Sequence, residues 1–243
     1  NKKLGNEANV ATNLNNIGNV YLDWGQYDEA LKYFNEALDI DKKLGREANI
    51  AYRLNNIGQV YNSWGQYDKA IKNFEEALAT FKKLGQEGSV ATVLNNIGQV
   101  YNSWGQYDEA LKYYKEALDI DKKLGREANI ANRLNNIGLV YNNWGQYDKA
   151  IKYYEEALAI SRKLGREAGS TVNLANIGNV YYSWGQHGKA LKYYEEVLAI
   201  ARKLGQEDKV ATHLNNIGMV YYFWGQYDKA IKYYEEALAI DKR

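Results

Sequence analysis

The residues best suited to specific recognition are asparagines that recur at a constant interval along this chain of 243 residues. An amide side chain offers N–H donors and a carbonyl acceptor, which match the C=O and N–H groups of a peptide backbone. Asparagine is a mediocre helix former, so its return at one position of every copy invites a functional reason. This first asparagine row comprises Asn16, Asn56, Asn96, Asn136, Asn176 and Asn216. We expect it to hold an extended chain through its backbone, and the open alternative is a merely polar residue shared through recent duplication.

Two further sets of residues flank the first asparagine row. A second asparagine row contains Asn15, Asn55, Asn95, Asn135 and Asn215 and is interrupted by Ala175. This second row could contact a ligand or could instead bond the neighbouring helix. The other flanking positions vary from copy to copy, and those assigned to peptide binding are Asn19, Gln59, Gln99, Asn179, Asn62, Asn102 and Asn142. Because the first row is constant, we expect the variable positions to supply specificity.

Large apolar side chains occupy the variable positions of the last two copies. Tyr182, Tyr222 and Phe223 lie there, together with Met219. We expect these residues, called the aromatic corner below, to form a pocket for a ligand side chain. The open alternative is that they cover the terminal copy or contact a following one.

Residues for other chemistries are scarce or isolated. The sequence contains no cysteine, which excludes disulfides, thiolate metal sites and cysteine nucleophiles. His187 and His213 are separated by most of a repeat and have no fixed partner. The pair Asp39 and Asp41 resembles the start of a calcium loop, but the next ligand positions hold lysine and leucine. Phosphate-binding glycine loops and the HExxH pattern are missing. We therefore predict no catalytic residue, no metal, no cofactor and no enzymatic activity.

The composition narrows the class of partner. A formal net charge of +1 argues against a surface that tracks nucleic-acid phosphates. No apolar run approaches the roughly 20 residues needed to cross a bilayer. We therefore expect no nucleic acid and no membrane as partners, and a cytoplasmic location. With 46% hydrophobic and 14% aromatic residues, the chain has enough apolar side chains for a well-packed core.

The elements that position these residues follow a strict 40-residue period. The dipeptide Trp-Gly returns without an insertion or deletion at 24–25, 64–65, 104–105, 144–145, 184–185 and 224–225. In the first copy, apolar residues at three- and four-residue steps predict a helix that ends at Gly25 and buries Val10, Leu14, Ile17, Tyr21 and Trp24. The segment YDEALKYFNEALDIDKKLG predicts a second helix that ends at Gly45. A fixed period of helical hairpins is typical of a solenoid, in which each copy packs on its neighbours. We expect the tryptophans to pack between neighbouring hairpins.

The repeated residues resemble the tetratricopeptide repeat family over essentially the whole chain. The pattern is carried in the first copy by Leu14, Ile17, Gly18, Tyr21, Gly25, Tyr27, Ala30, Phe34, Ala37 and Leu38. The copies depart from the common 34-residue form because they are longer and lack a proline after the second helix. They resemble the long repeats of kinesin light chains in the LNNIG phrase and those of GoLoco-containing adaptors in the 40-residue period. The resemblance implies that the first helix of each hairpin lines a concave groove, where asparagines at this position contact bound peptide.

These observations predict an all-α, right-handed superhelical solenoid of six helix-turn-helix repeats in a single array, 1–243. The expected repeats are 6–45, 46–85, 86–125, 126–165, 166–205 and 206–243, with residues 1–5 as the tail of a preceding repeat. The expected function is a protein–protein interaction scaffold that binds an extended peptide or a disordered partner segment in its concave groove. The alternative is a structural spacer, or a scaffold that self-associates head to tail through the apolar faces of its terminal hairpins.

Overall fold

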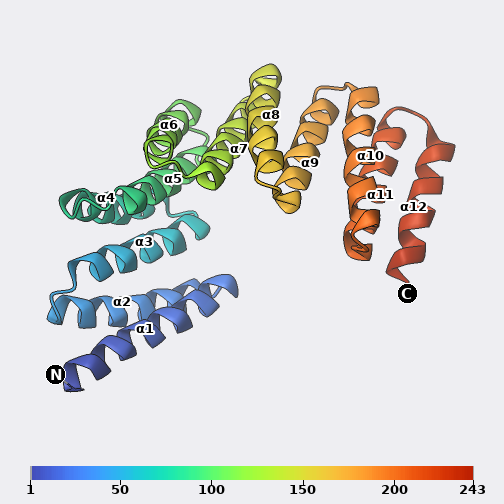
Figure 1. Ribbon diagram of the computed structural model, residues 1–243. Helices are drawn as coiled ribbons and strands as arrows, with labels where there is room; N and C mark the ends of the chain where they lie inside the picture. The colour runs from blue at the N-terminus through green and yellow to red at the C-terminus, as the bar shows by residue number, and fades with distance from the viewer. Residues whose placement is uncertain (1, 243) are drawn as a thin grey trace. The chain divides into compact units, whose positions relative to one another are not determined.

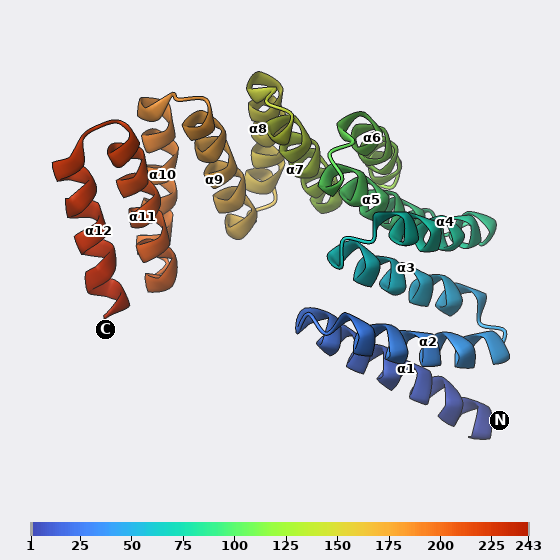
Figure 2. The same ribbon diagram turned by 180° about the vertical axis from the view of Figure 1, so that it is seen from behind.

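The computed structural model describes residues 2–242, which form twelve α-helices and no β-strand (Figures 1 and 2). The chain divides into two compact units, the first ending at Arg126 and the second beginning at Glu127. The helices of the first unit are α1 (Lys2–Asp23), α2 (Tyr27–Lys43), α3 (Glu47–Ser63), α4 (Tyr67–Lys83), α5 (Glu87–Ser103) and α6 (Tyr107–Lys123). Those of the second unit are α7 (Glu127–Asn143), α8 (Tyr147–Lys163), α9 (Glu167–Ser183), α10 (His187–Lys203), α11 (Glu207–Phe223) and α12 (Tyr227–Asp241).

Within each unit, consecutive helices pair as hairpins that lie side by side, as the labels in Figure 1 show. The predicted glycine stop is confirmed at the end of α1, where Gly25 has a φ of 74°. Its N–H donates to the carbonyl of Leu22 at 2.9 Å, and the N–H of Gln26 donates to that of Tyr21 at 2.8 Å. This pair of bonds is the Schellman arrangement, which satisfies the last carbonyls of a helix and needs a left-handed residue. The solenoid of helical hairpins predicted from the repeat period is thus confirmed inside each unit.

The beginning of the chain differs from the expected tail of a preceding repeat. Residues 2–5 continue α1 to its N-terminal side, so Gly5 lies inside a helix, whereas its counterpart Gly45 ends one. Glycine tolerates a helix interior at a cost of about 1 kcal/mol, so other contacts decide whether it stops the helix. Asn1, the first residue of the predicted tail, lies outside the described residues.

The buried side of each first helix is wider than the predicted stripe. Leu54 and Ile57 of α3 are buried as expected, but Val60, which the stripe omitted, is also fully buried. The reason is that α3 packs on α2 as well as on α4. In α1, the predicted core residues Val10, Ile17 and Trp24 remain 42%, 40% and 71% exposed, which corrects the expectation for this first copy.

The tryptophans pack between hairpins at the protein surface. The ring of Trp64 lies 5.8 Å from that of Tyr27 in the preceding hairpin, and Trp104 lies 5.7 Å from Tyr67 in the same way. The predicted packing between neighbouring hairpins is therefore confirmed for these two residues. Both rings nevertheless stay more than a third exposed, so they seal the edge of the core and do not form its centre.

Two equivalent contacts between neighbouring hairpins of the first unit, called joints below, contain different kinds of side chain. One joint is charged and the other is apolar. In the charged joint (Asp41, Arg46 and Arg53), the fully buried carboxylate of Asp41 accepts a hydrogen bond of 3.0 Å from Arg53 Nε. Arg46 Nε lies 3.1 Å from Oδ1 of Asp41 without hydrogen-bond alignment, so this second contact is purely electrostatic. In the apolar joint (Phe81, Gln86 and Val93), Phe81 and Val93 take the places of Asp41 and Arg53 and are both buried in the core.

Candidate functional site

The asparagine rows lie on one face of the first helices, called the amide face below, and bond each other between hairpins. Asn56 Nδ2 donates to Asn15 Oδ1 at 2.7 Å, and Asn96 Nδ2 donates to Asn55 Oδ1 at 2.8 Å. In the second unit, Asn176 Nδ2 donates to Asn135 Oδ1 at 2.8 Å. The second row therefore bonds the neighbouring helix, which was one of the two alternatives that the sequence left open.

These bonds fix the amides but leave them unequally accessible. Asn16 is exposed, Asn56, Asn136, Asn176 and Asn216 are half-buried, and Asn96 is only 8% exposed. An amide has two N–H groups and a carbonyl with two lone pairs, so one bond to a neighbour leaves capacity for a ligand. Asn216 differs from the others because Ala175 stands where its acceptor would be.

The variable positions surround the amide rows. Asn19, Gln99 and Asn179 are exposed, whereas Gln59, Asn62, Asn102 and Asn142 are half-buried. Asn179 Oδ1 accepts a hydrogen bond of 2.6 Å from the Tyr194 hydroxyl, and burial raises the pKa of Tyr194, which keeps this donor neutral. The Oδ1 atoms of Asn62 and Asn142 are buried and have no hydrogen-bond partner among the described residues.

The aromatic corner comes together in the second unit. The ring of Phe223 lies 5.9 Å from that of Tyr182 and 5.2 Å from that of Tyr222, both edge to face. Tyr222 and Phe223 are 52% and 61% exposed, while Tyr182 is half-buried. Burial, followed by the repulsion that its phenolate would meet from that of the nearby Tyr234, raises the pKa of Tyr182, so its hydroxyl stays neutral. The corner therefore offers an apolar surface with hydroxyl groups, which suits an apolar ligand side chain.

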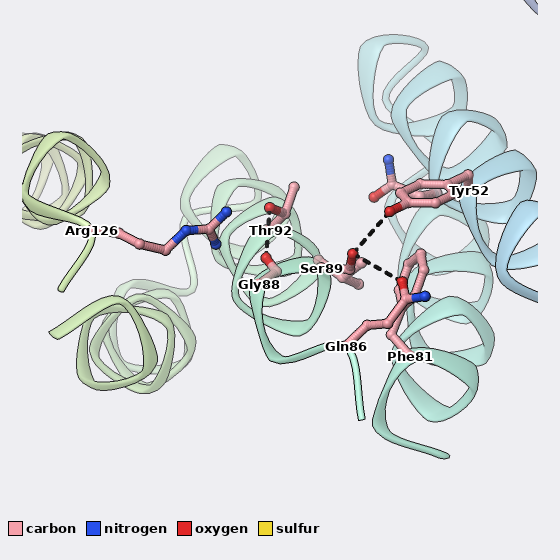
Figure 3. A pocket seen from close by; sticks show the side chains of 9 residues that line it. Tyr52, Phe81, Gln86, Gly88, Ser89, Thr92 and Arg126 are labelled. Atoms are coloured by element: carbon pink, nitrogen blue, oxygen red, sulfur yellow. Dashed lines mark hydrogen bonds between the residues drawn. The ribbon is translucent and has the colours of Figure 1, made fainter. Parts of the chain in front are cut away.

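A pocket of about 380 Å³ that the sequence did not predict lies in the first unit, over the first turn of α5 (Figure 3). Its lining residues are Tyr52, Asn55, Phe81, Gln86, Gly88, Ser89, Thr92, Val93 and Arg126. The Tyr52 hydroxyl and Ser89 Oγ are 3.1 Å apart and share a hydrogen bond, and Ser89 Oγ donates to Gln86 Oε1 at 3.4 Å. The missed signal was the joint departure of Tyr52, Phe81, Gly88 and Ser89 from the other copies.

A family model for the tetratricopeptide repeat matches five overlapping segments, 9–83, 47–123, 89–163, 127–203 and 167–243. Together these segments cover nearly the whole chain. The chain belongs to the tetratricopeptide repeat family. The repeats are therefore tetratricopeptide hairpins of the long form, as their residues predicted.

Solved structures share this fold at low sequence identity. BtubC (BKLC) from P. vanneervenii is 23% identical, with a TM-score of 0.76 over 89% of this chain and 91% of that one. A putative kinesin light chain from Podosopora anserina with nearly identical repeats is 20% identical, with a TM-score of 0.69 over 82% and 98%. A Rap protein complexed with Competence and Sporulation Factor is 16% identical, with a TM-score of 0.65 over 94% and 74%. The comparison with curated protein sequences finds no relative.

Membership of this family indicates the general class of the protein. This tetratricopeptide repeat fold is generally a non-catalytic scaffold for protein interactions. Among residues 2–242, no cluster of three histidine or carboxylate side chains could hold a metal ion. Over the same part of the chain, none of the helices combines the length and the apolar character that a membrane crossing requires.

Proposed function

We propose that this tetratricopeptide chain is a non-enzymatic scaffold that binds an extended peptide, or a disordered segment of a partner protein, along its amide face. The observation that carries the proposal is the fixed orientation of the amides. The bonds of 2.7–2.8 Å between hairpins hold Asn56, Asn96 and Asn176 in one repeated arrangement before a ligand arrives. Because the amides are already ordered, a ligand backbone that bonds them loses less of its binding free energy to side-chain ordering.

The chemistry of the amide face favours a peptide that binds with moderate affinity through its backbone N–H and C=O groups. The positions of both rows are uncharged in every copy. A hydrogen bond between neutral amides contributes about 0.5–1.5 kcal/mol. Several such bonds would give a micromolar dissociation constant, which corresponds to a binding free energy of about −8 kcal/mol. The aromatic corner in the second unit would then add selectivity for an apolar side chain.

The test is binding of a random-peptide library to the whole chain, followed by titration of the selected peptides. Asn16→Ala and Asn216→Ala remove two amides that have no bond to a preceding row, so the fold keeps its internal bonds. We expect the double variant to weaken binding by about 1–3 kcal/mol with an unchanged melting temperature. Lys232→Ala, on the exposed side of α12, is the matched control and should bind normally. Absence of selected peptides, or equal affinity of the double variant, would contradict the proposal.

A second candidate function is head-to-tail self-association. On α12, Ile231 and Leu238 are 53% and 50% exposed, whereas the equivalent Leu191 and Leu198 of α10 are buried under the next hairpin. On α1, Val20 is exposed where its equivalent Val60 is fully buried. These two faces match the two sides of a normal joint, and a second copy of the chain would cover both. Such contacts join unlike surfaces and build filaments or rings. Sedimentation over a hundredfold range of concentration should show a rising mass, and a constant monomer mass would contradict this candidate.

A further inference from the structure

The repeat pattern changes at four positions that meet around one pocket. Tyr52 stands where most copies have threonine, and Phe81 stands where others have aspartate, serine or alanine. Gly88 replaces the usual alanine, and Ser89 replaces the usual asparagine. These four residues are up to 37 positions apart in the sequence, yet all of them line the pocket over the first turn of α5. Because the four changed residues meet in space and line one pocket, we interpret them as one binding site.

One side of the pocket is aromatic and held in place. The ring of Tyr52 lies edge to face with that of Phe81, with 4.9 Å between the ring centres, and its hydroxyl shares a hydrogen bond with Ser89 Oγ. Phe81 is buried and forms the floor, whereas Tyr52 is 46% exposed and offers a ring face to a ligand. A held aromatic ring binds another apolar or aromatic side chain with little loss of conformational entropy.

The other side of the pocket carries a guanidinium group that depends on Gly88. A Cβ atom added to Gly88 would lie 2.6 Å from Arg126 Nη1, so the end of this flexible side chain would have to shift. The absence of that carbon therefore lets the guanidinium lie against the first turn of α5. Arg126 Nη1 is 3.5 Å from Asp121 Oδ1, and this contact uses one of the five donors of the group. A guanidinium pairs with a carboxylate through two parallel hydrogen bonds, so the remaining donors suit an acidic group.

Resting on the proposed peptide binding, we propose that this pocket selects a segment with an acidic side chain beside an aromatic or large apolar one. In Figure 3, Tyr52 and Arg126 approach the first turn of α5 from opposite sides, so such a segment would lie across that turn. Its ring packs on the exposed Tyr52, above the buried Phe81, and its carboxylate pairs with Arg126. The side chains of Ser89 and Thr92 lie between them.

The test uses four synthetic peptides that share a glycine-serine frame and carry Phe-Glu, Phe-Gln, Ser-Glu or Ser-Gln at the centre. Titration into the whole chain, followed by amide NMR, reports both affinity and location. We expect Phe-Glu to bind about tenfold more tightly than Phe-Gln or Ser-Glu and to shift the Gly88 and Ser89 amides. Gly88→Ala and Arg126→Gln should remove the preference for Phe-Glu over Phe-Gln. Tyr52→Ala should remove the preference for Phe-Glu over Ser-Glu.

Gly88→Ala is the sharpest variant because it adds one methyl group inside a helix, where alanine is favoured over glycine. Its melting temperature should be equal or higher, so lost selectivity cannot come from unfolding. The preferences of Lys232→Ala, on the exposed side of α12, should stay as in the unchanged chain. Equal binding of all four peptides, with shifts confined to the rest of the amide face, would overturn the pocket and leave the proposed function standing. Shifts nowhere, together with an empty library selection, would overturn both.

Discussion

The charged joint and the apolar joint occupy equivalent places in the first unit and differ in almost every side chain that fills them. Asp41 and Arg53 form a buried ion pair in one, and Phe81 and Val93 replace them in the other. The hydrogen bond between asparagine side chains across each joint has nearly the same length, 2.7 Å in the first and 2.8 Å in the second. Hairpin stacking therefore accepts either chemistry, provided that the two sides of the joint match. A pocket lies beside the apolar joint, and the equivalent residues beside Ser161 and Asn173 in the second unit line another.

The largest expected effect comes from breaking the charged joint. Asp41→Ala leaves Arg53 buried beside an apolar cavity and removes its hydrogen bond. Because an unpaired buried charge is costly, we expect the free energy of unfolding to fall by about 3–5 kcal/mol. Urea denaturation of the variant and the unchanged chain measures the difference. A loss below about 1 kcal/mol would show that the ion pair is exchanged for water at little cost.

An intermediate effect on stability is expected from the hydrogen bond between asparagine side chains that both joints contain. Asn96→Ala removes the donor of the hydrogen bond to the side-chain oxygen of Asn55. We expect this loss to lower the free energy of unfolding by about 1–3 kcal/mol. Asn216→Ala is the matched control, because Ala175 offers no acceptor to that residue, and it should change stability by less than about 0.5 kcal/mol. The two midpoints of urea denaturation decide the matter. Equal losses would mean that the bonds between rows contribute nothing to the joint.

A smaller net effect is expected when one joint is converted into the other. Asp41→Phe, Arg46→Gln and Arg53→Val together give the charged joint the side chains of the apolar one. Replacing a buried ion pair by well-packed apolar residues is often close to neutral, so we expect stability within about 1–2 kcal/mol of the original. The same denaturation measurement applies. A loss as large as that of Asp41→Ala alone would show that the backbones of the two joints differ.

A pH dependence of small size is expected from a third version of the joint, in which Ala201 and His213 occupy the places of Asp41 and Arg53. Burial, and then the charge of Lys209, lower the pKa of His213 below 6.5. The unfolded chain therefore binds this proton more readily, and stability falls as the pH drops below 6.5. His213→Asn, which copies Asn173, should flatten this part of the curve of stability between pH 7.5 and 5.5. An identical curve for the variant would rule out His213 as its cause.

The sequence predicted most of what depends on a single hairpin but only part of what depends on two, such as the tryptophan packing between hairpins. Gly25 and the apolar residues of each helix obey local rules, so the helices and their ends could be predicted. The bond between Asn96 and Asn55 joins residues 41 positions apart in neighbouring hairpins, and helix periodicity gives the face of a residue without its exact neighbour. For the same reason Val60 was missed, because its burial comes from the preceding hairpin. The pocket was missed because Gly88 and Arg126 reveal their relation only in three dimensions.

Because of the matched pairs at the joints, the six similar hairpins are not freely interchangeable. If the second hairpin were lost through recombination between similar repeats, the strict repeat period would survive, yet Asp41 would face Val93. A buried carboxylate would then have no cation, and the shortened protein would be unstable although each remaining hairpin was intact. The joints thus restrict which losses of whole copies leave a stable protein.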